Sequence, residues 1–407
     1  MKKTLKLSLI TAGAAMLFAM PAFAQVDGLC NDCHTMHNSV GGNPVAVTKL
    51  GAGGSFSITP YASLLLTDCE GCHMAGGVNK LEPIGSGFSP QVYHTDSLDL
   101  AGGNFAYIDG IKGTGASDRK GHNVVDIVGV DALLTGPPGM GRGATQTSLH
   151  TAADAVPAST FTCAGNDGCH GTRNQLISTA VAGTTSTAVP EVKRQGLAAM
   201  GGTHHYNIDG VIDASTSGSD AATGFRFIWG LYGLENPDAT HPWENFDATS
   251  HNEYYGQNGS PFTGSCEDCH DGSGHGDTTT SHMTAANHTI SGFCGGCHGT
   301  FHMTTDAAGA FIRHPSDYAL PGTGEYAAYT TYDLTAPVAR ATVPSSSSAT
   351  VTPGGGEDIV MCLSCHMAHA SDNDGMLRFD YTTMVAGAGA NTTGCFVCHS
   401  TKDTNTP

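Results

Sequence analysis

The sequence predicts a fold of mostly coil and turns with short helices and little regular secondary structure. Three observations predict it: glycine accounts for 55 of the 407 residues, only 39% of the residues are hydrophobic, and neither a strong amphipathic helix nor a clean alternating strand pattern is present. A chain of this composition has few of the large aliphatic side chains that fill an ordinary core. Much of its interior must therefore come from another source.

A short motif, Cys-x-x-Cys-His, indicates what that source is. The pattern attaches a c-type haem, because the two thiols form thioethers with the porphyrin and the adjacent imidazole becomes the proximal iron ligand. Chance would produce on the order of a few hundredths of one copy in this composition, so the motif is specific. The six copies are Cys30, Cys33 and His34; Cys69, Cys72 and His73; Cys266, Cys269 and His270; Cys294, Cys297 and His298; Cys362, Cys365 and His366; and Cys395, Cys398 and His399.

A seventh copy has a longer spacer between its cysteines. Cys163 and Cys169 are the two cysteines left over, and His170 follows the second of them as in the other copies. We interpret this copy as an expanded attachment site, C-x5-C-H, whose glycine-containing spacer loops out. A disulfide between the two cysteines is the alternative, since exported proteins form such bonds. Zinc is a weaker alternative for any one motif, because structural zinc needs two ligand pairs brought together.

Seven haems c would supply the missing apolar interior. We therefore expect a multihaem cytochrome in which coil and short helices wrap a continuous haem stack, and in which folding is coupled to haem attachment. Residues 25–407 are expected to form a single seven-haem domain, because the long cysteine-poor segments can deliver iron ligands. The Pro-, Ser- and Gly-rich segment at about 334–357 is expected to be a surface linker.

The first residues, 1–24, have the features of a signal peptide. Three lysines and a short apolar stretch precede Ala22-Phe23-Ala24, which matches the A-x-A cleavage rule. Haem c is attached outside the cytoplasm, so export agrees with the motifs, and we expect a secreted, cell-surface protein. The formal net charge of −19 makes nucleic acid and anionic membranes poor partners. Ferric minerals, cationic sites and cytochromes with basic patches are better ones.

The seven proximal histidines leave 14 of the 21 histidines as candidates for the second axial position. The strongest candidates, His37 and His369, follow a haem motif by one helical turn. Such a histidine lies on the proximal side of its own haem, so it can ligate only a different iron. The next candidates are isolated in cysteine-free stretches: His94, His122, His205, His251 and His314. His205 is only weakly preferred to its neighbour His204, and His302 stands close behind the candidates.

Several segments resemble the extracellular multihaem cytochromes of metal-reducing bacteria. Within that group the likeness is greatest to the filament-forming cytochromes, the cytochrome nanowires. The matching segments are spread from residue 30 to the end of the chain, with dissimilar loops between them. They are Cys-Asn-Asp-Cys-His-Thr-Met-His-Asn-Ser (30–39), Asp-Arg-Lys-Gly-His-Asn (118–123), Arg-His-Pro (313–315), Cys-Leu-Ser-Cys-His-Met-Ala-His-Ala-Ser (362–371) and Cys-Phe-Val-Cys-His (395–399).

The resemblance implies low-potential haems with two histidine ligands each, stacked in one unbroken line. It also implies that His37 crosses to the next subunit and ligates the haem of the motif that ends at His366. A head-to-tail contact of that kind does not close on itself and generates a filament. The chain differs from the six-haem pattern of the family by its expanded motif at His170.

We expect the protein to be an electron conduit and not an enzyme. It would take electrons from donor cytochromes of the periplasm or outer membrane and pass them through seven bis-histidyl haems c to extracellular acceptors such as metal oxides. On the resemblance it would do so as a head-to-tail homopolymer. The alternatives are a monomeric periplasmic or outer-surface carrier, a subunit that plugs an outer-membrane porin, and a multihaem reductase, which would need one iron with an open position.

Overall fold

The computed structural model describes parts of the chain between residues 29 and 402. The described ranges are 29–49, 54–59, 61, 64–85, 87–129, 131, 134, 136–139, 161–163, 168–170, 211–212, 233–236, 238, 240–259, 289–302, 313–389 and 392–402.

Three of the sequence predictions lie outside these described residues. One is the signal peptide at residues 1–24, and another is the candidate ligand His205. The third is a whole attachment motif, made of the two cysteines Cys266 and Cys269 and the proximal ligand His270. For this motif the assignment of a haem remains a prediction from the sequence.

The helices are short, and most are a single turn. The α-helices are α1 (Cys30–Cys33), α2 (Cys69–His73), α5 (Ile290–Cys297), α6 (Gly299–His302) and α7 (Cys395–Cys398). The 3₁₀ helices are η2 (Phe105–Tyr107), η3 (Asp118–Lys120), η6 (Gly324–Ala328), η7 (Cys362–Ser364), η8 (Asp374–Met376) and η9 (Tyr381–Thr383). Within the described ranges, no helix has the length and apolar character needed to cross a membrane.

The strands are equally short and form three small antiparallel sheets. The first is a hairpin of β1 (Leu81–Ile84) and β2 (Gly87–Pro90), whose turn begins at Gly85 with a φ of +56° that glycine adopts without strain. The second has the order β3-β4-β5, with β3 (Val211–Ile212), β4 (Gly233–Leu234) and β5 (Glu253–Tyr254). The third has the order β6-β8-β7, with β6 (Tyr318–Ala319), β8 (Asp358–Val360) and β7 (Ala339–Arg340). The predicted fold of mostly coil with short elements is confirmed.

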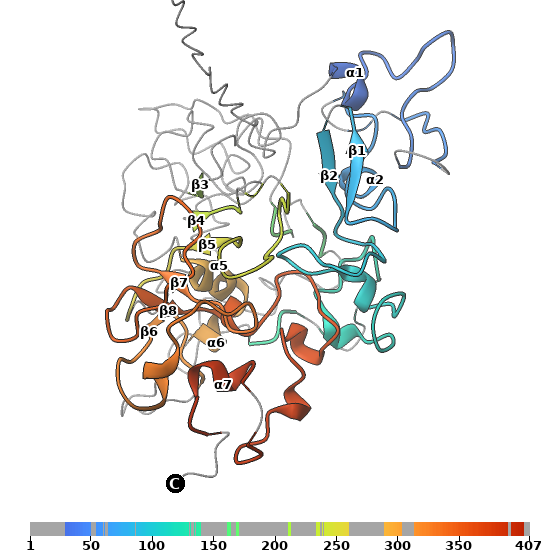
Figure 1. Ribbon diagram of the computed structural model, residues 1–407. Coiled ribbons are helices and arrows are strands. Elements are labelled where there is room, and N and C mark those ends of the chain that lie inside the picture. The colour runs from blue at the N-terminus through green and yellow to red at the C-terminus, as the bar shows by residue number, and fades with distance from the viewer. Residues whose placement is uncertain are drawn as a thin grey trace, which may run out of the picture.

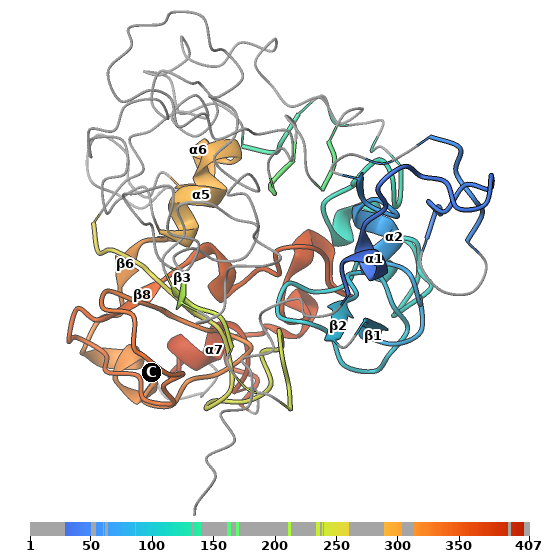
Figure 2. The same cartoon turned by 90° about the horizontal axis from the view of Figure 1, so that it is seen from above.

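Two segments far apart in sequence hold the described chain together. In both views the elements α1, α2, β1 and β2 lie to one side, and the sheet β6-β8-β7 lies to the other (Figure 1, Figure 2). Residues 102–122 and 368–372 run next to each other, and Lys120 Nζ lies 2.8 Å from Asp372 Oδ1. The backbone hydrogen bonds that join them are Asn104 N to Ala370 O (3.0 Å), His122 N to His369 O (3.0 Å), Ser371 N to Lys120 O (3.0 Å) and His369 N to Gly102 O (2.6 Å).

Many of the buried hydrophobic side chains of the described residues belong to three clusters. One is Tyr254, Ile290, Ala339, Ile359, Met361 and Leu363. Another is Leu320, Tyr329, Tyr332, Val338 and Val351. The last is Phe105, Ile108, Val124 and Ala370. Each cluster adjoins a haem motif or a segment that carries candidate ligands, so the packing is organised around several sites and not around one centre.

The prediction of a surface linker at 334–357 is wrong for the first half of that segment. It contains β7, and its side chains Val338 and Ala339 are 1% and 0% exposed. The part after β7 is mixed, with Ser345 and Ser346 exposed at a bend, and the end at 354–357 is an exposed turn. Proline, serine and glycine are typical of linkers, but small side chains also let one strand pack closely on another, as β7 does on β8.

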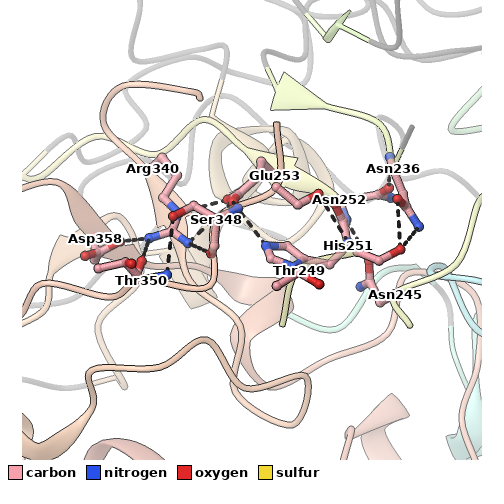
Figure 3. A network of polar contacts seen from close by, with 12 residues as sticks. Asn236, Asn245, Thr249, His251, Asn252, Glu253, Arg340, Ser348, Thr350 and Asp358 are labelled. Atoms are coloured by element: carbon pink, nitrogen blue, oxygen red, sulfur yellow. Dashed lines mark hydrogen bonds and ion pairs between the residues drawn. The ribbon is translucent and has the colours of Figure 1, made fainter. Parts of the chain in front are cut away.

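Arg340 in β7 lies in a buried network of charged side chains (Figure 3). Its Nε donates to Glu253 Oε2 at 2.8 Å, and its Nη1 pairs with the carboxylate of Asp358. The same guanidinium donates to the carbonyl oxygens of Ser348 and Thr350, both at 2.8 Å. Because Glu253 belongs to β5 and Asp358 to β8, this network ties the second sheet to the third.

Candidate haem sites

Each regular Cys-x-x-Cys-His motif that the structure describes lies on a single helical turn. The turns are α1, α2, the end of α5, η7 and α7. Residues three apart share one face of such a turn, so the two thiols of a motif lie on one side and the histidine follows at its end. In four motifs the histidine amide donates to the carbonyl of the first cysteine: His34 to Cys30 (2.8 Å), His298 to Cys294 (2.9 Å), His366 to Cys362 (3.1 Å) and His399 to Cys395 (2.9 Å).

The turn α2 is fixed at its second cysteine by the strand that follows it. The carbonyl oxygen of Cys72 accepts hydrogen bonds from Ser89 Oγ at 2.8 Å and from Gln91 Nε2 at 2.7 Å. Both Cys69 and Cys72 are half-buried. The hairpin β1-β2 and the residue after it therefore hold this attachment turn in place.

The expanded motif closes in the same way as the regular ones despite its longer spacer. His170 N donates to Cys163 O at 3.0 Å, and Thr162 forms a bridge with Gly168. The residues before and after the spacer therefore lie next to each other. Both cysteines are free thiols in the structure, and burial raises the pKa of Cys169 to about 11. The hydrogen bond from the histidine amide to the carbonyl of the first cysteine is thus present here, as it is in the regular motifs.

Backbone carbonyl oxygens orient three of the proximal imidazoles. A carbonyl only accepts, so the bonded Nδ1 carries the hydrogen and Nε2 keeps its lone pair for a metal. Partners of this kind orient metal-bound histidines in general. The bonds are His73 Nδ1 to Pro90 O (2.7 Å), His298 Nδ1 to Pro138 O (2.6 Å) and His366 Nδ1 to Gly375 O (2.6 Å). A carboxylate takes this place for His399, whose Nδ1 lies 3.3 Å from Glu325 Oε1.

The described imidazoles meet in pairs at a separation that suits one metal ion between them. A metal–imidazole bond is about 2.0–2.1 Å long, so two rings on opposite sides of one ion have centroids roughly 6 Å apart. Three pairs join a proximal histidine to a predicted distal one. They are His298 with His122 (6.0 Å), His170 with His369 (6.3 Å) and His399 with His314 (6.3 Å).

The pair of His122 and His298 shows the clearest geometry. His122 Nδ1 donates to Ala368 O at 2.9 Å, and the Nδ1 of His298 also donates to a carbonyl oxygen. The Nε2 atom of each ring therefore keeps its lone pair for a metal ion. Burial lowers the pKa of His122 to about 4, and the neighbouring His298 adds to the effect. His122 is therefore neutral at pH 7, and the neutral imidazole is the form that binds a metal.

His369 lies opposite His170, the histidine of a different motif. Its amide donates to Gly102 O at 2.6 Å, and its ring stacks on Phe105 with a centroid separation of 5.1 Å. A Cβ atom at Gly102 would lie only 2.7 Å from His369 Nδ1, so glycine is required at this close approach. Burial lowers the pKa of His369 to about 3, which keeps this ring neutral as well.

His94 is a further candidate with a suitable environment. The residue is 0% exposed, and neither ring nitrogen has a hydrogen-bond partner. The Nε2 atom lies 3.8 Å from Asp99 Oδ1, and Asn104 holds the backbone of His94 by hydrogen bonds to its N and O. A buried polar atom without a partner costs about 1–3 kcal/mol. Coordination of a metal would satisfy one nitrogen of this ring.

His37 lies on the surface just after α1, where large hydrophobic side chains are exposed. These are Leu29, Met36, Val40, Phe56, Ile58 and Leu64, which are 46–88% exposed. His366, in contrast, is fixed by Gly375 O, and within the described part of the chain no histidine ring is paired with it as in the three pairs above.

The structure speaks against His251 as an iron ligand. Its Nδ1 lies 3.2 Å from Asp247 O, and its Nε2 lies 3.1 Å from Glu253 Oε1 (Figure 3). Each ring nitrogen thus faces an oxygen atom of the chain at hydrogen-bond distance, and neither is directed at a second imidazole as in the three pairs above. The sequence could not distinguish this case, because an isolated histidine in a long segment can equally be part of a buried polar network. His302 also donates from Nε2, to Asp317 Oδ2 at 2.9 Å.

Thiols of different motifs come into contact. Cys294 and Cys362 form a hydrogen bond to each other, and this contact lowers the pKa of Cys362 to about 7. The attachment sites on α5 and η7 are therefore immediate neighbours.

Taken together, these side chains fit haem c. Paired thiols on one turn, an imidazole at its end, an oriented Nε2 and a second neutral imidazole at the required separation are the donor set of a bis-histidyl haem. The acceptors that orient these rings could not be identified from the sequence, because most are backbone atoms of segments far from the motif.

Comparisons with known proteins agree with the motifs. A family model described as a doubled CXXCH motif matches residues 355–404. Over 438 residues the chain is 26% identical to the C-type cytochrome OmcS of Geobacter sulfurreducens, an alignment that covers 96% of this chain and 89% of OmcS. Two solved OmcS structures from the same organism were also found. The outer membrane cytochrome S filament has a TM-score of 0.42 at 18% identity, covering 88% of this chain and 85% of that one. The OmcS nanowires have a TM-score of 0.45 at 19% identity, covering 94% and 92%.

Proposed function

We propose that this chain, a multihaem c-type cytochrome related to OmcS, transfers electrons outside the cell through seven bis-histidyl haems in one line. The observation that carries the proposal is the pairing of imidazoles from different segments at 6.0–6.3 Å. Haem c bound at such sites supplies a reversible ferric–ferrous couple. The chain holds both imidazoles of each pair in place, and a second imidazole on each iron would leave no position for a substrate. This arrangement favours electron transfer over catalysis.

Contacts between sites support a line of haems. Cys294 and Cys362, from two different motifs, touch each other. His122 N donates to His369 O at 3.0 Å, so the ligands proposed for two different irons are joined through one backbone hydrogen bond. Electrons move between cofactors only when these are close together, and such contacts keep neighbouring sites close.

The count of seven depends on the expanded motif at Cys163, Cys169 and His170. Its closing hydrogen bond supports attachment of a haem there. Mass spectrometry of the mature protein is expected to give the mass of the chain plus seven haems. A mass with six haems, together with a disulfide between Cys163 and Cys169, would remove this motif from the proposal.

The count also includes the motif of Cys266, Cys269 and His270, for which the sequence is the sole support. Digestion of the mature protein is expected to give a peptide that contains both cysteines and carries the mass of one haem. An unmodified peptide from this region would reduce the proposed count by one.

The proposed homopolymer uses the exposed apolar surface around His37. Two copies that each carry a formal net charge of −19 repel each other, so apolar contact must hold them together, and salt should strengthen the association by screening the repulsion. A neighbouring copy that covers this surface would bring its own haem, bound at the motif of His366, within reach of His37 of the first copy. The resemblance to the filament-forming cytochromes implies this donation of an iron ligand from one subunit to the next.

Replacing His37 by alanine tests the polymer. The variant is expected to keep all its haems and to lose its filaments in electron micrographs of purified material. His241→Ala is the matched control, because His241 stacks on Phe246 within its own chain and its loss should leave filaments intact. Filaments that persist without His37 would refute the shared ligand. Single particles in the unaltered protein would favour the monomeric carrier.

The proposed partners follow from this assignment. Donor cytochromes of the periplasm or outer membrane would supply electrons, and extracellular metal oxides or other acceptors would remove them. The acidic chain favours acceptors and cytochromes with positive surface charge. Uptake of CO by one reduced haem per protomer would instead indicate an open iron and favour the reductase.

A further inference from the structure

Arg378 lies against the haem motif of Cys362, Cys365 and His366, and the backbone of that motif holds it there. Its Nε donates to Leu363 O at 2.6 Å, and its Nη1 donates to Leu334 O at 3.3 Å. The amide of Arg378 donates to Cys365 O at 2.8 Å. Leu363 and Cys365 belong to the attachment turn itself, so the guanidinium is fixed relative to the site where the haem is attached.

The short segment that carries Arg378 also orients the proximal imidazole. Gly375 O accepts the hydrogen bond from His366 Nδ1 at 2.6 Å. Leu377 forms an antiparallel bridge with His366, which places 375–378 alongside the motif. The position of the cation and the position of the iron ligand are therefore set by the same few residues.

No carboxylate in the described part of the chain forms an ion pair with Arg378. This is unusual in a chain with 36 acidic and 17 basic residues. Arg340 faces Glu253, and Arg119 faces Asp374. Among the described residues, Arg378 is bonded to backbone carbonyl oxygens instead.

The charge of Arg378 persists at neutral pH. Burial lowers the pKa of Arg378, and the nearby Tyr332 and Tyr254 act in the opposite direction. An arginine starts from so high a pKa that it stays protonated in proteins. A charge in a partly buried place acts strongly on its neighbours, because little water screens it.

We propose that Arg378 raises the reduction potential of the haem bound at the motif that ends at His366. Reduction lowers the positive charge on the iron by one unit, so a fixed cation beside the site favours the reduced state. Charge and hydrogen bonding around a haem are among the means by which a protein sets its potential. The inference rests on the proposed haem at this motif. With a raised potential, this haem would be reduced in preference to its neighbours in the line.

The test is a reductive titration of the matured protein, followed by haem absorbance. In Arg378→Gln, one haem's share of the absorbance change is expected to move to lower potential, while the rest of the curve stays in place. Arg119→Gln is the matched control. It removes the same charge from a side chain that is 76% exposed, so its titration curve is expected to match that of the unaltered protein.

Arg378→Lys gives a second test that does not depend on maturation of the glutamine variant. At neutral pH the lysine is charged, and the titration curve is expected to match that of the unaltered protein. Raising the pH then removes the charge in place, so one haem is expected to shift to lower potential. The unaltered protein is expected to show no such shift over the same pH range, because its arginine stays charged.

Two results would overturn the proposal. One is a haem-loaded Arg378→Gln protein whose curve superimposes on that of the unaltered protein, and the other is an Arg378→Lys protein without a pH-dependent shift. Mass spectrometry of the peptide with Cys362 and Cys365 separates these results from a failure of the proposed function. A peptide that lacks haem in the unaltered protein would refute attachment at this motif, whatever Arg378 does.

Discussion

Among single residues, the histidines show how hydrogen bonds decide what a side chain can bind. His122 and His251 are both isolated in cysteine-free stretches, so the sequence predicts the same role for both. In the structure His122 donates from Nδ1 to a backbone carbonyl, and its ring lies 6.0 Å from that of His298, centroid to centroid. His251 gives both nitrogens to oxygen acceptors, one of them Glu253. Their chemistry differs although their sequence context does not.

Replacing His122 by alanine is expected to open one iron position at the haem of His298. The reduced variant should then bind CO at one haem per protomer, which a CO difference spectrum measures. His251→Asn is the control, because asparagine keeps a donor for the polar network and no iron loses a ligand. CO binding by the His251 variant, and none by the His122 variant, would contradict the pairing.

The sequence predicts the attachment residues, but it does not predict the pairing of ligands. Cysteines and proximal histidines follow from a local motif in which every member lies within one turn. The second axial histidine comes from a segment far away in sequence. Which motif that segment lies against is set by contacts such as the hydrogen bond from His369 N to Gly102 O. No local pattern encodes such a contact.

Among the elements, the one-turn helices carry most of the attachment geometry. The same bond, from the histidine amide to the carbonyl of the first cysteine, closes four regular motifs and the expanded one. For closing the motif, the length of the spacer therefore matters less than the hydrogen bond between the first cysteine and the histidine. This is the reason that a spacing outside the usual pattern can be interpreted as the same kind of site.

Shortening the expanded spacer is expected to preserve haem attachment. Deletion of residues 165–167 leaves Cys-Ala-Gly-Cys-His, which has the regular spacing, and the closing bond already has the regular geometry. The mass of the matured variant should still include seven haems. Joint replacement of Cys163 and Cys169 by serine is the control and should lower the count to six. A count of six in the shortened protein would show that the longer spacer is needed.

The segment 334–357 shows where composition misleads at this scale. Its Pro, Ser and Gly content is typical of a linker, yet Arg340 within it joins Glu253 and Asp358 in the interior. Burial acts to raise the pKa of Glu253, but hydrogen bonds from His251 and Arg340 outweigh this and lower the pKa. A single arginine with two carboxylate partners elsewhere in the chain is not visible in any local window of sequence.

Replacing Arg340 by methionine is expected to destabilise the matured protein by roughly 3–5 kcal/mol, because two buried carboxylates lose their cation. The midpoint of denaturation by guanidinium chloride, followed by circular dichroism, measures the loss. Arg119→Met removes an exposed arginine and should change the stability by less than about 0.5 kcal/mol.

The same network has a definite pH dependence. Since the pKa of Glu253 is lowered in the folded state, its contribution is fully present above the unfolded value of about 4.3 and is lost as the pH falls through the lower folded value. In the Arg340 variant burial acts on Glu253 without the opposing guanidinium, so the folded pKa of Glu253 is higher and the variant should lose less of its remaining stability on acidification than the unaltered protein loses. Equal acid sensitivity of the two proteins would contradict this account of Glu253.

At the scale of the whole molecule, the buried apolar side chains of the described residues are divided. The three clusters contain six, five and four buried residues. Composition predicts this general character, because glycine is abundant and large aliphatic residues are scarce. It does not predict which segments lie together, since that arrangement depends on the positions of the sites.

The chain without haem is therefore expected to remain largely unfolded. Expression in cells that lack the machinery for haem c attachment should give a product that a protease degrades rapidly and that lacks near-ultraviolet circular dichroism. The matured protein should resist the same protease at its described core segments. A protease-resistant product without haem would show that the polypeptide folds by its own packing.

The stretch 366–378 contributes to several of the proposed haem sites at once. It provides His369 opposite His170, the carbonyl of Ala368 that fixes His122, and the carbonyl of Gly375 that fixes His366. A peptide tag or labelling sequence inserted there would disturb three irons with one change. The exposed turn at 354–357 contains none of these groups, so it is the better place at which an engineer could anchor the protein to an electrode.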